Sequence, residues 1–152
     1  MAGLLLVVTS VILALTCAES SVDVYNAAIR GDFERVVELL GMAVDPNFRS
    51  EETGYTSLIL AVKANNVHVV NLMLSANVDV NAAENDGWTP LHFATSSEHY
   101  EIMQLLVEAG ATPSSLTNNG LDCLTIAKGQ EDGTAANLLQ DAIANHAVRM
   151  KE

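Results

Sequence analysis

The feature that most constrains this chain is an internal repeat with a period of 33 residues. Four columns recur at this spacing: Gly54, Gly87 and Gly120; Leu58, Leu91 and Leu124; Ala61, Ala94 and Ala127; Leu72, Leu105 and Leu138. An earlier copy fits the same pattern with one extra residue in its trailing loop. A fixed period of this length is typical of a stacked array, in which each copy buries its apolar face against its neighbours.

Each copy contains a turn glycine, a short apolar helix, a break, a second apolar helix and a polar loop. In the third copy, Thr89 is positioned to cap the first helix and Pro90 to occupy its first turn. His92 follows the cap by three residues, so we expect it to bond back toward Thr89 as in a capping box. Leu91 is expected to face inward. These four residues and the turn glycines Gly54, Gly87 and Gly120 are therefore predicted to be structural.

At these residues the chain resembles a known family. "DGWTPLHFATSSEHYEIMQLLVEAGA" and "TGYTSLILAVKANNVHVVNLMLSANVDVN" resemble ankyrin repeats, and more divergent copies flank them. The resemblance implies an all-α repeat solenoid, an ankyrin-repeat stack of helix-turn-helix units with β-hairpin fingers. The repeats are expected at about residues 20–50, 51–83, 84–116 and 117–149, within a domain spanning 19–152.

The resemblance also implies a left-handed residue, ordinarily glycine, between the two helices of each repeat. Gly31 occupies this place in the first copy, Asn65 in the second and Glu98 in the third. Asparagine tolerates the left-handed region, but for glutamate the conformation costs roughly 1 kcal/mol or more. We therefore expect backbone strain at Glu98.

The N-terminal segment has a different character. Residues 2–18 carry no charge, and small residues at Thr16 and Ala18 suit a signal peptidase. We expect residues 1–18 to be a signal peptide and the domain to be secreted, although no Lys or Arg precedes the apolar run. The alternative is a membrane-anchored structural subunit held by an uncleaved helix, but a spanning helix needs ~20 apolar residues.

Composition and motifs argue against several function classes. The formal net charge is −12, from 19 acidic and 7 basic residues, which disfavours nucleic-acid binding and fits a basic partner, or simple solubility, better. No two histidines are spaced as a helical metal pair, and no catalytic or phosphate-binding motif is present. We expect no enzyme activity, cofactor, metal or small-molecule substrate. Cys123 is expected to be a small buried residue.

What remains is a binding surface. The resemblance implies a concave face of fingers and inner helices, along which the residue after each turn glycine points: Tyr55, Trp88 and Leu121. Trp and Tyr are frequent interface anchors, so we predict an unidentified protein partner here. Neighbouring candidates are Glu52 and Asp86 on the fingers and Lys63 and Arg30 on the inner helices. Alternatively, the rings only cover adjacent hairpins.

Overall fold

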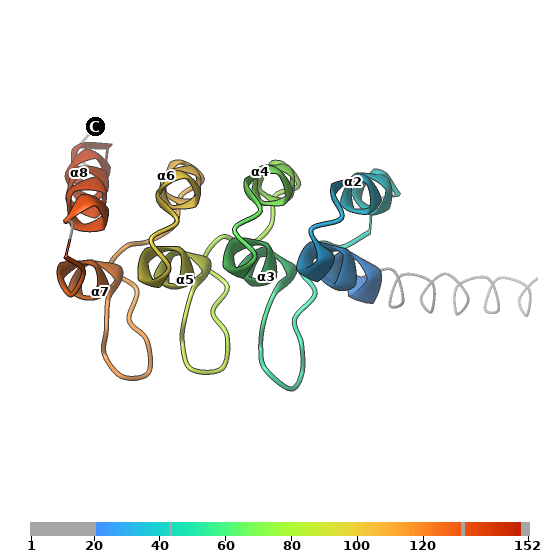
Figure 1. The fold of residues 1–152 in the computed structure, drawn as a ribbon, viewed down its shortest axis with the longest axis horizontal. Helices are drawn as coiled ribbons and strands as arrows, with labels where there is room; N and C mark the ends of the chain where they lie inside the picture. Colours follow the sequence, from blue (N-terminus) through green and yellow to red (C-terminus); the bar gives the residue numbers. More distant parts are fainter. Residues whose placement is uncertain (1–20, 43, 132, 150–152) are drawn as a thin grey trace, which may run out of the picture.

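The computed structural model describes residues 21–42, 44–131 and 133–149, and over these residues the chain forms stacked pairs of helices. The first helices of the pairs are residues 21–30, α3 (Ser57–Lys63), α5 (Pro90–Ser96) and α7 (Cys123–Lys128). The second helices are α2 (Phe33–Gly41), α4 (Val67–Ser75), α6 (Tyr100–Glu108) and α8 (Thr134–Arg149). Figure 1 shows two rows of helices with three loops, here called fingers, projecting from one side. The predicted all-α repeat array is confirmed.

The expected signal peptide, residues 1–18, lies outside the described residues. Among the helices that are described, none combines the length and apolar character that crossing a membrane requires.

The core lies between the two rows and between successive repeats. Helix α5 packs against both α3 and α7, and α6 packs against both α4 and α8. The first helices bury side chains at the repeated positions, among them Leu58, Leu91, Ala94 and Ala127. Each repeat therefore buries its apolar side chains against a neighbour, as the period predicts.

In the second helices the fully buried position falls one residue later than the repeated leucines. Leu105 and Leu138 are only half-buried, whereas Leu106 and Leu139 are fully buried. In α6, Ile102 and Leu106 are four residues apart and share the inward face. Leu105 is rotated away from that face by one residue.

The first helices begin at repeated side-chain caps. The side chains of Thr56, Thr89 and Asp122 each accept a hydrogen bond from the backbone N–H three residues later. A cap of this kind satisfies a donor that the helix itself leaves unpaired. The helix starts are thus fixed locally, at the same 33-residue spacing.

The junctions between paired helices have the expected left-handed backbone. Gly31, Asn65 and Glu98 have φ values of 66°, 53° and 57°. The Glu98 side chain is exposed and its carboxylate accepts a hydrogen bond from the Tyr100 hydroxyl at 3.3 Å. This exposed contact compensates little for a backbone conformation that disfavours a Cβ atom.

Glu98→Gly is therefore expected to stabilise the domain, by up to about 1 kcal/mol, because glycine adopts positive φ without steric cost. The matched control is Glu98→Ala, which removes the same carboxylate but keeps the Cβ atom. Urea denaturation of both variants makes the comparison. If alanine stabilised as much as glycine, the carboxylate rather than the backbone would be the source of the strain.

The fingers are hairpin-shaped loops rather than strands. One backbone pair closes each: Ser50 N–H to Tyr55 O, Glu84 N–H to Trp88 O, and Thr117 N–H to Leu121 O. In the described parts of the chain, the bridge between Arg49 and Thr56 is the only β pairing, and it is isolated. A ladder would have to continue away from the tip, but the residue after each closing carbonyl is already the cap of the next helix, so the expected β-hairpin ladder does not form.

Asparagine side chains join adjacent fingers. Asn85 Nδ2 donates to Glu52 O at 3.1 Å, and Asn118 Nδ2 donates to Asn85 O at 3.0 Å. These residues are 33 apart, so the same strut is repeated. The close approach depends on glycine: a Cβ atom on Gly87 would lie 2.9 Å from Asn118 N, and the backbone there has a φ of 83°.

Gly120 offers a matched comparison for Gly87. Its φ is 75°, yet a Cβ atom there would have no neighbour within 4 Å, because among the described residues no other finger packs against it. We expect Gly120→Ala to cost ~1–2 kcal/mol of unfolding free energy through its backbone alone. Gly87→Ala should lower the free energy of unfolding clearly more, since the added Cβ atom would also push the adjacent finger away. Thermal melts of the two variants test this expectation, and equal losses would contradict it.

Candidate functional site

Three aromatic rings and one lysine meet between the first two fingers and their helices. The Phe93 ring lies 5.8 Å from the Tyr55 ring and 5.2 Å from the Trp88 ring, centroid to centroid. Tyr55 and Trp88 come from successive fingers, whereas Phe93 comes from α5. We call Tyr55, Lys63, Trp88 and Phe93 the ring cluster.

Lys63 is held on the rings by two kinds of contact. Its Nζ donates a hydrogen bond to the Tyr55 hydroxyl at 3.0 Å. The same atom lies 4.3 Å from the Tyr55 ring centroid and 4.9 Å from that of Phe93. Both distances fall within the range of cation–π attraction. Lys63 is in the last turn of α3, where a positive charge also suits the helix dipole.

Beside the ring cluster is an open hollow of about 250 Å³, which we call the finger hollow. Its lining residues are Tyr55, Glu84, Asp86, Trp88, Phe93 and Ser96. Aromatic faces thus alternate with carboxylates around a surface accessible from solvent. Such a combination of apolar rings and a few polar groups is typical of recognition sites.

Glu84 fixes the finger that carries Trp88. Its side chain is buried, and Oε1 accepts hydrogen bonds from the backbone N–H groups of Asp86 and Trp88, each at 3.0 Å. A buried carboxylate requires such partners. The position of Trp88 is therefore set by the finger turn rather than left to an unconstrained loop.

The structure brings together only part of the predicted binding set. Tyr55, Trp88 and Lys63 meet in the ring cluster, and Asp86 lines the adjoining hollow. Glu52 is exposed on the first finger, where its backbone oxygen accepts from Asn85.

Two members of that set are separate. Leu121 is 37% exposed, and it has no aromatic ring to add to the cluster. Its backbone oxygen instead faces His92 Nε2. Arg30 is exposed at the end of the helix over residues 21–30, in a repeat that supplies no residue to the cluster. From repeat position alone, Leu121 was expected in one row with Tyr55 and Trp88, and Arg30 on the inner helices beside that row.

Phe93 and Glu84 line the site but were not predicted from the sequence. Phe93 is three residues before Ser96 in α5, so the two share a helix face. An aromatic residue on the same helix face as Ser96, five residues after Trp88, is the sequence signal that could have identified Phe93. No comparable signal marks Glu84, because its role depends on the fold of the turn.

Trp88 is more involved in packing than expected. Its side chain is half-buried, and its ring lies 5.2 Å from Phe93 and 5.9 Å from His92. Trp88→Ala should therefore also lower the free energy of unfolding, because it removes these ring contacts. We expect a loss of about 1 kcal/mol from the ring contacts alone.

His92 has a structural position in α5, between the cap of its own helix and the following finger. It is fully buried; Nδ1 accepts from Thr89 N–H at 3.1 Å, and Nε2 lies 3.1 Å from Ser115 O and 3.3 Å from Leu121 O. Because Nδ1 must be an acceptor, the proton of the neutral ring is on Nε2. Burial lowers the pKa of His92, although hydrogen bonds to Leu121 and Ser115 oppose the shift.

Cys123 is equally unsuited to chemistry. The thiol is buried, and desolvation raises its pKa to about 12, so it is protonated at neutral pH. In the portion of the chain that the structure describes, no group of His, Cys, Asp and Glu side chains is arranged to hold a metal ion.

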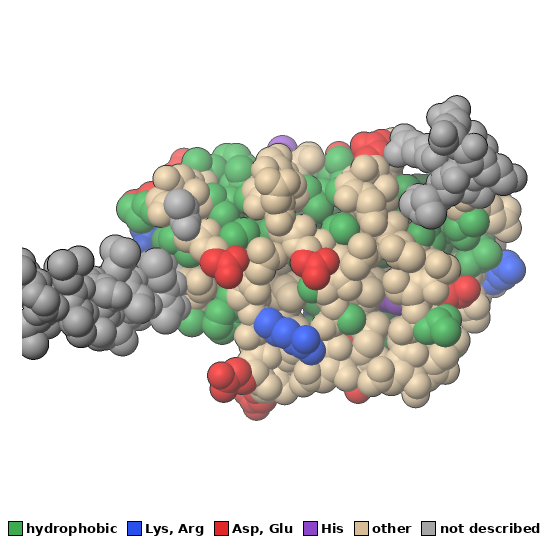
Figure 2. Space-filling view, turned by 180° about the vertical axis from the view of Figure 1, so that it is seen from behind, with side chains coloured by type: hydrophobic (Ala, Val, Ile, Leu, Met, Phe, Trp, Pro, Cys, Tyr) green, Lys and Arg blue, Asp and Glu red, His purple; other side chains and the backbone are tan. Residues whose placement is uncertain are grey.

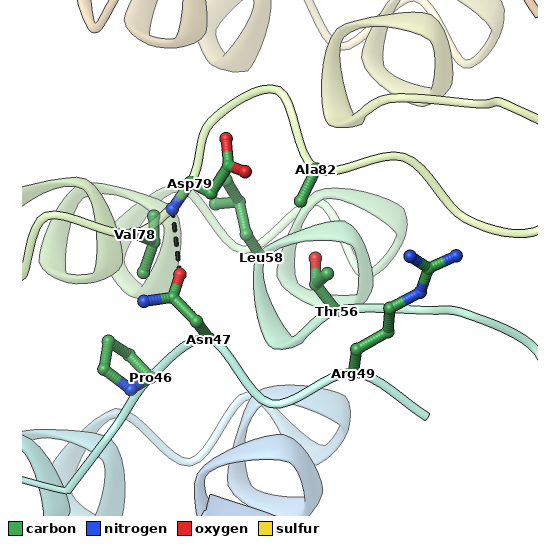
Figure 3. A pocket seen from close by; sticks show the side chains of 8 residues that line it. All are labelled: Pro46, Asn47, Arg49, Thr56, Leu58, Val78, Asp79 and Ala82. Carbon is green, nitrogen blue, oxygen red and sulfur yellow. Dashed lines mark hydrogen bonds between the residues drawn. The ribbon is translucent and has the colours of Figure 1, made fainter. Parts of the chain in front are cut away.

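A second hollow, of about 240 Å³, lies between the loops that follow α2 and α4 (Figure 3). Asp79 N–H donates to Asn47 Oδ1 across it at 2.9 Å. The Arg49 guanidinium donates instead to Asn85 Oδ1 at 3.2 Å. The polar groups at this hollow thus join successive repeats, and we assign it a structural role.

The face opposite the view of Figure 1 carries scattered charges. Figure 2 shows acidic and basic side chains mixed among polar ones there, with no continuous basic surface. A phosphate backbone requires clustered Lys and Arg. This face therefore gives no support to nucleic-acid binding.

Comparison with known proteins agrees with the geometry. A family model described as ankyrin repeats matches three copies over residues 24–117, which is more than half of the chain. No curated protein matches the chain significantly. Helices α7 and α8 lie after the matched region and continue the same stack. Ankyrin repeats are modules of protein–protein interaction and are not themselves catalytic. By its sequence match and its helical array, the chain belongs to the ankyrin-repeat family.

Proposed function

We propose that this protein binds a protein partner on the surface formed by the fingers and the first helices, with the ring cluster at its centre. The observation that carries this proposal is the finger hollow: two half-buried aromatic residues from successive fingers flank a third ring, Phe93, next to open space. Aromatic side chains held in a fixed position lose little conformational freedom on binding and make effective anchors.

The proposed role is recognition without catalysis, cofactor or metal. The titratable groups support it: His92 is used in packing between repeats, Glu84 in a turn, and Cys123 is buried. His92 and Cys123 do not line the finger hollow, and Glu84, which does, has Oε1 engaged by two backbone N–H groups. The rigid stack then serves to hold the recognition surface in one shape.

Trp88→Ala tests the proposed surface. We expect binding of the partner to weaken by about 2 kcal/mol or more, as for a central interface anchor. The measurement is quantitative capture of partner from the native source by the immobilised full chain. The control is Tyr25→Ala, which removes another half-buried aromatic residue, packed 5.3 Å from Phe48 and outside the ring cluster. If both variants retained the partner equally well, the binding surface would lie elsewhere.

We also propose that the domain acts outside the cytosol, with residues 1–18 removed and Glu19 as the mature N-terminus. The support is the uncharged apolar run followed by Thr16 and Ala18. Intact-mass measurement of the protein from its native source tests this. A mass that includes residues 1–18 would instead favour the anchored alternative.

A further inference from the structure

The 33-residue period makes the second and third repeats directly comparable at the ring cluster. Tyr55 in the second repeat corresponds to Trp88 in the third, and Lys63 corresponds to Ser96. In the second repeat, the ammonium group of Lys63 covers the Tyr55 ring at 4.3 Å. The equivalent pair in the third repeat is a larger ring with a serine, which is too short to cover it.

The space that a longer side chain at residue 96 would fill is open. Ser96 is exposed in the last turn of α5, and together with Trp88 it lines the finger hollow of about 250 Å³. Tryptophan is the aromatic residue that attracts cations most strongly. The third repeat therefore presents a stronger cation-binding ring than the second, without a cation of its own.

The charges around the finger hollow favour a positive occupant. Glu84 and Asp86 both line it, whereas Lys63 is engaged with the Tyr55 hydroxyl and with two rings. Two carboxylates against one ammonium group leave the surroundings with a net negative charge. The whole chain, at a formal −12, adds a long-range field of the same sign.

We propose that the finger hollow binds an arginine or lysine side chain from a basic segment of the protein partner, stacked on Trp88 where the third repeat lacks the equivalent of Lys63. The inference rests on the proposed function and specifies the chemistry of the partner. Asp86, which is exposed, supplies a carboxylate within the same hollow to pair with the cation.

Trp88 provides the signal for a direct test because it is the only tryptophan in the chain. The probe is a capped peptide with two arginines separated and flanked by glycines, titrated into the full chain while tryptophan fluorescence is recorded. Two control peptides carry glutamine or glutamate in place of arginine. We expect a saturable change with the arginine peptide that weakens as salt is added, and none with the controls.

Ser96→Lys is the decisive variant, because it restores within the third repeat the cation that Lys63 provides in the second. It should fill the site and weaken binding of the arginine peptide by about tenfold or more. Ser97→Lys is the matched control: it adds the same charge at the next exposed residue, outside the lining of the hollow. We expect it to retain binding within about twofold, since a rim charge is largely screened.

The outcomes separate this inference from the proposed function. Equal binding of the arginine and glutamine peptides, or equal loss in Ser96→Lys and Ser97→Lys, would overturn the cation site. The cation site would also be overturned if Trp88→Ala lost the native partner but Ser96→Lys retained it. That result would still support the proposed binding surface. Retention of the partner by Trp88→Ala would instead overturn the surface itself.

Discussion

Replacing Leu91 by alanine is expected to cost about 2–5 kcal/mol of unfolding free energy, the range found for buried leucine truncations. Leu91 is fully buried in α5, the helix that packs against both α3 and α7. In a repeat array, stability depends on each repeat and on the interfaces with its neighbours. A cavity in a central first helix therefore weakens two interfaces.

Leu139→Ala is the matched control for this prediction. Leu139 is also fully buried, but it belongs to α8, the last helix of the array, which packs against α6 and α7 on one side only. We expect Leu139→Ala to cost less than Leu91→Ala in urea denaturation. The reverse order would mean that the terminal repeat, not the centre, limits the stability of the stack.

The parts of this structure that could be predicted from sequence are those encoded within one repeat. The cap at Thr89 requires only that an oxygen-bearing side chain precede a helical pattern, so its position follows from the residues around it. The left-handed junction at Glu98 follows from the period, because Gly31 and Asn65 mark the same place in earlier copies. Both the cap and the junction can be predicted because each depends on local residues that recur at a fixed spacing.

Contacts between repeats were harder to predict. The sequence places Trp88 after a turn glycine, but it does not show that Phe93 of the following helix lies between Trp88 and Tyr55. Nor does it show that Asn85 and Asn118 link adjacent fingers instead of facing a partner. These contacts depend on the distance and rotation between successive repeats, and the sequence pattern sets only the order of the residues.

His92 shows the same division within one side chain. Its bond to Thr89 is local and was predicted; its approach to Ser115 and Leu121 spans two repeats and was not. Nδ1 supports the helix start, whereas Nε2 supports the next finger. Loss of the bond to Thr89 alone would cost roughly 1 kcal/mol of unfolding free energy.

His92→Ala is expected to cost about 3 kcal/mol of unfolding free energy, because the carbonyl groups facing Nε2 lose their donor in addition to the lost cap. His92→Gln separates the two contributions. Glutamine at this helix position can accept from the Thr89 N–H as in a capping box, but it is too short to reach the next finger as well. We expect glutamine to recover about 1 kcal/mol of the loss. Full recovery would show that the Nε2 contacts contribute nothing.

The lowered pKa of His92 adds a pH dependence to the same comparison. In the unfolded chain the imidazole titrates near its ordinary value of 6.5, whereas burial lowers its pKa in the folded state. Below pH 6.5 the unfolded chain therefore binds more protons, so the stabilisation from neutral His92 is complete above that pH and declines as the pH falls toward the lowered value. The difference in unfolding free energy between wild type and His92→Gln should shrink correspondingly in urea denaturation at pH 7.5, 6.5 and 5.5, values chosen around that window. A difference that stayed constant would mean that the His92 proton is bound equally in both states, and that burial does not keep the ring neutral.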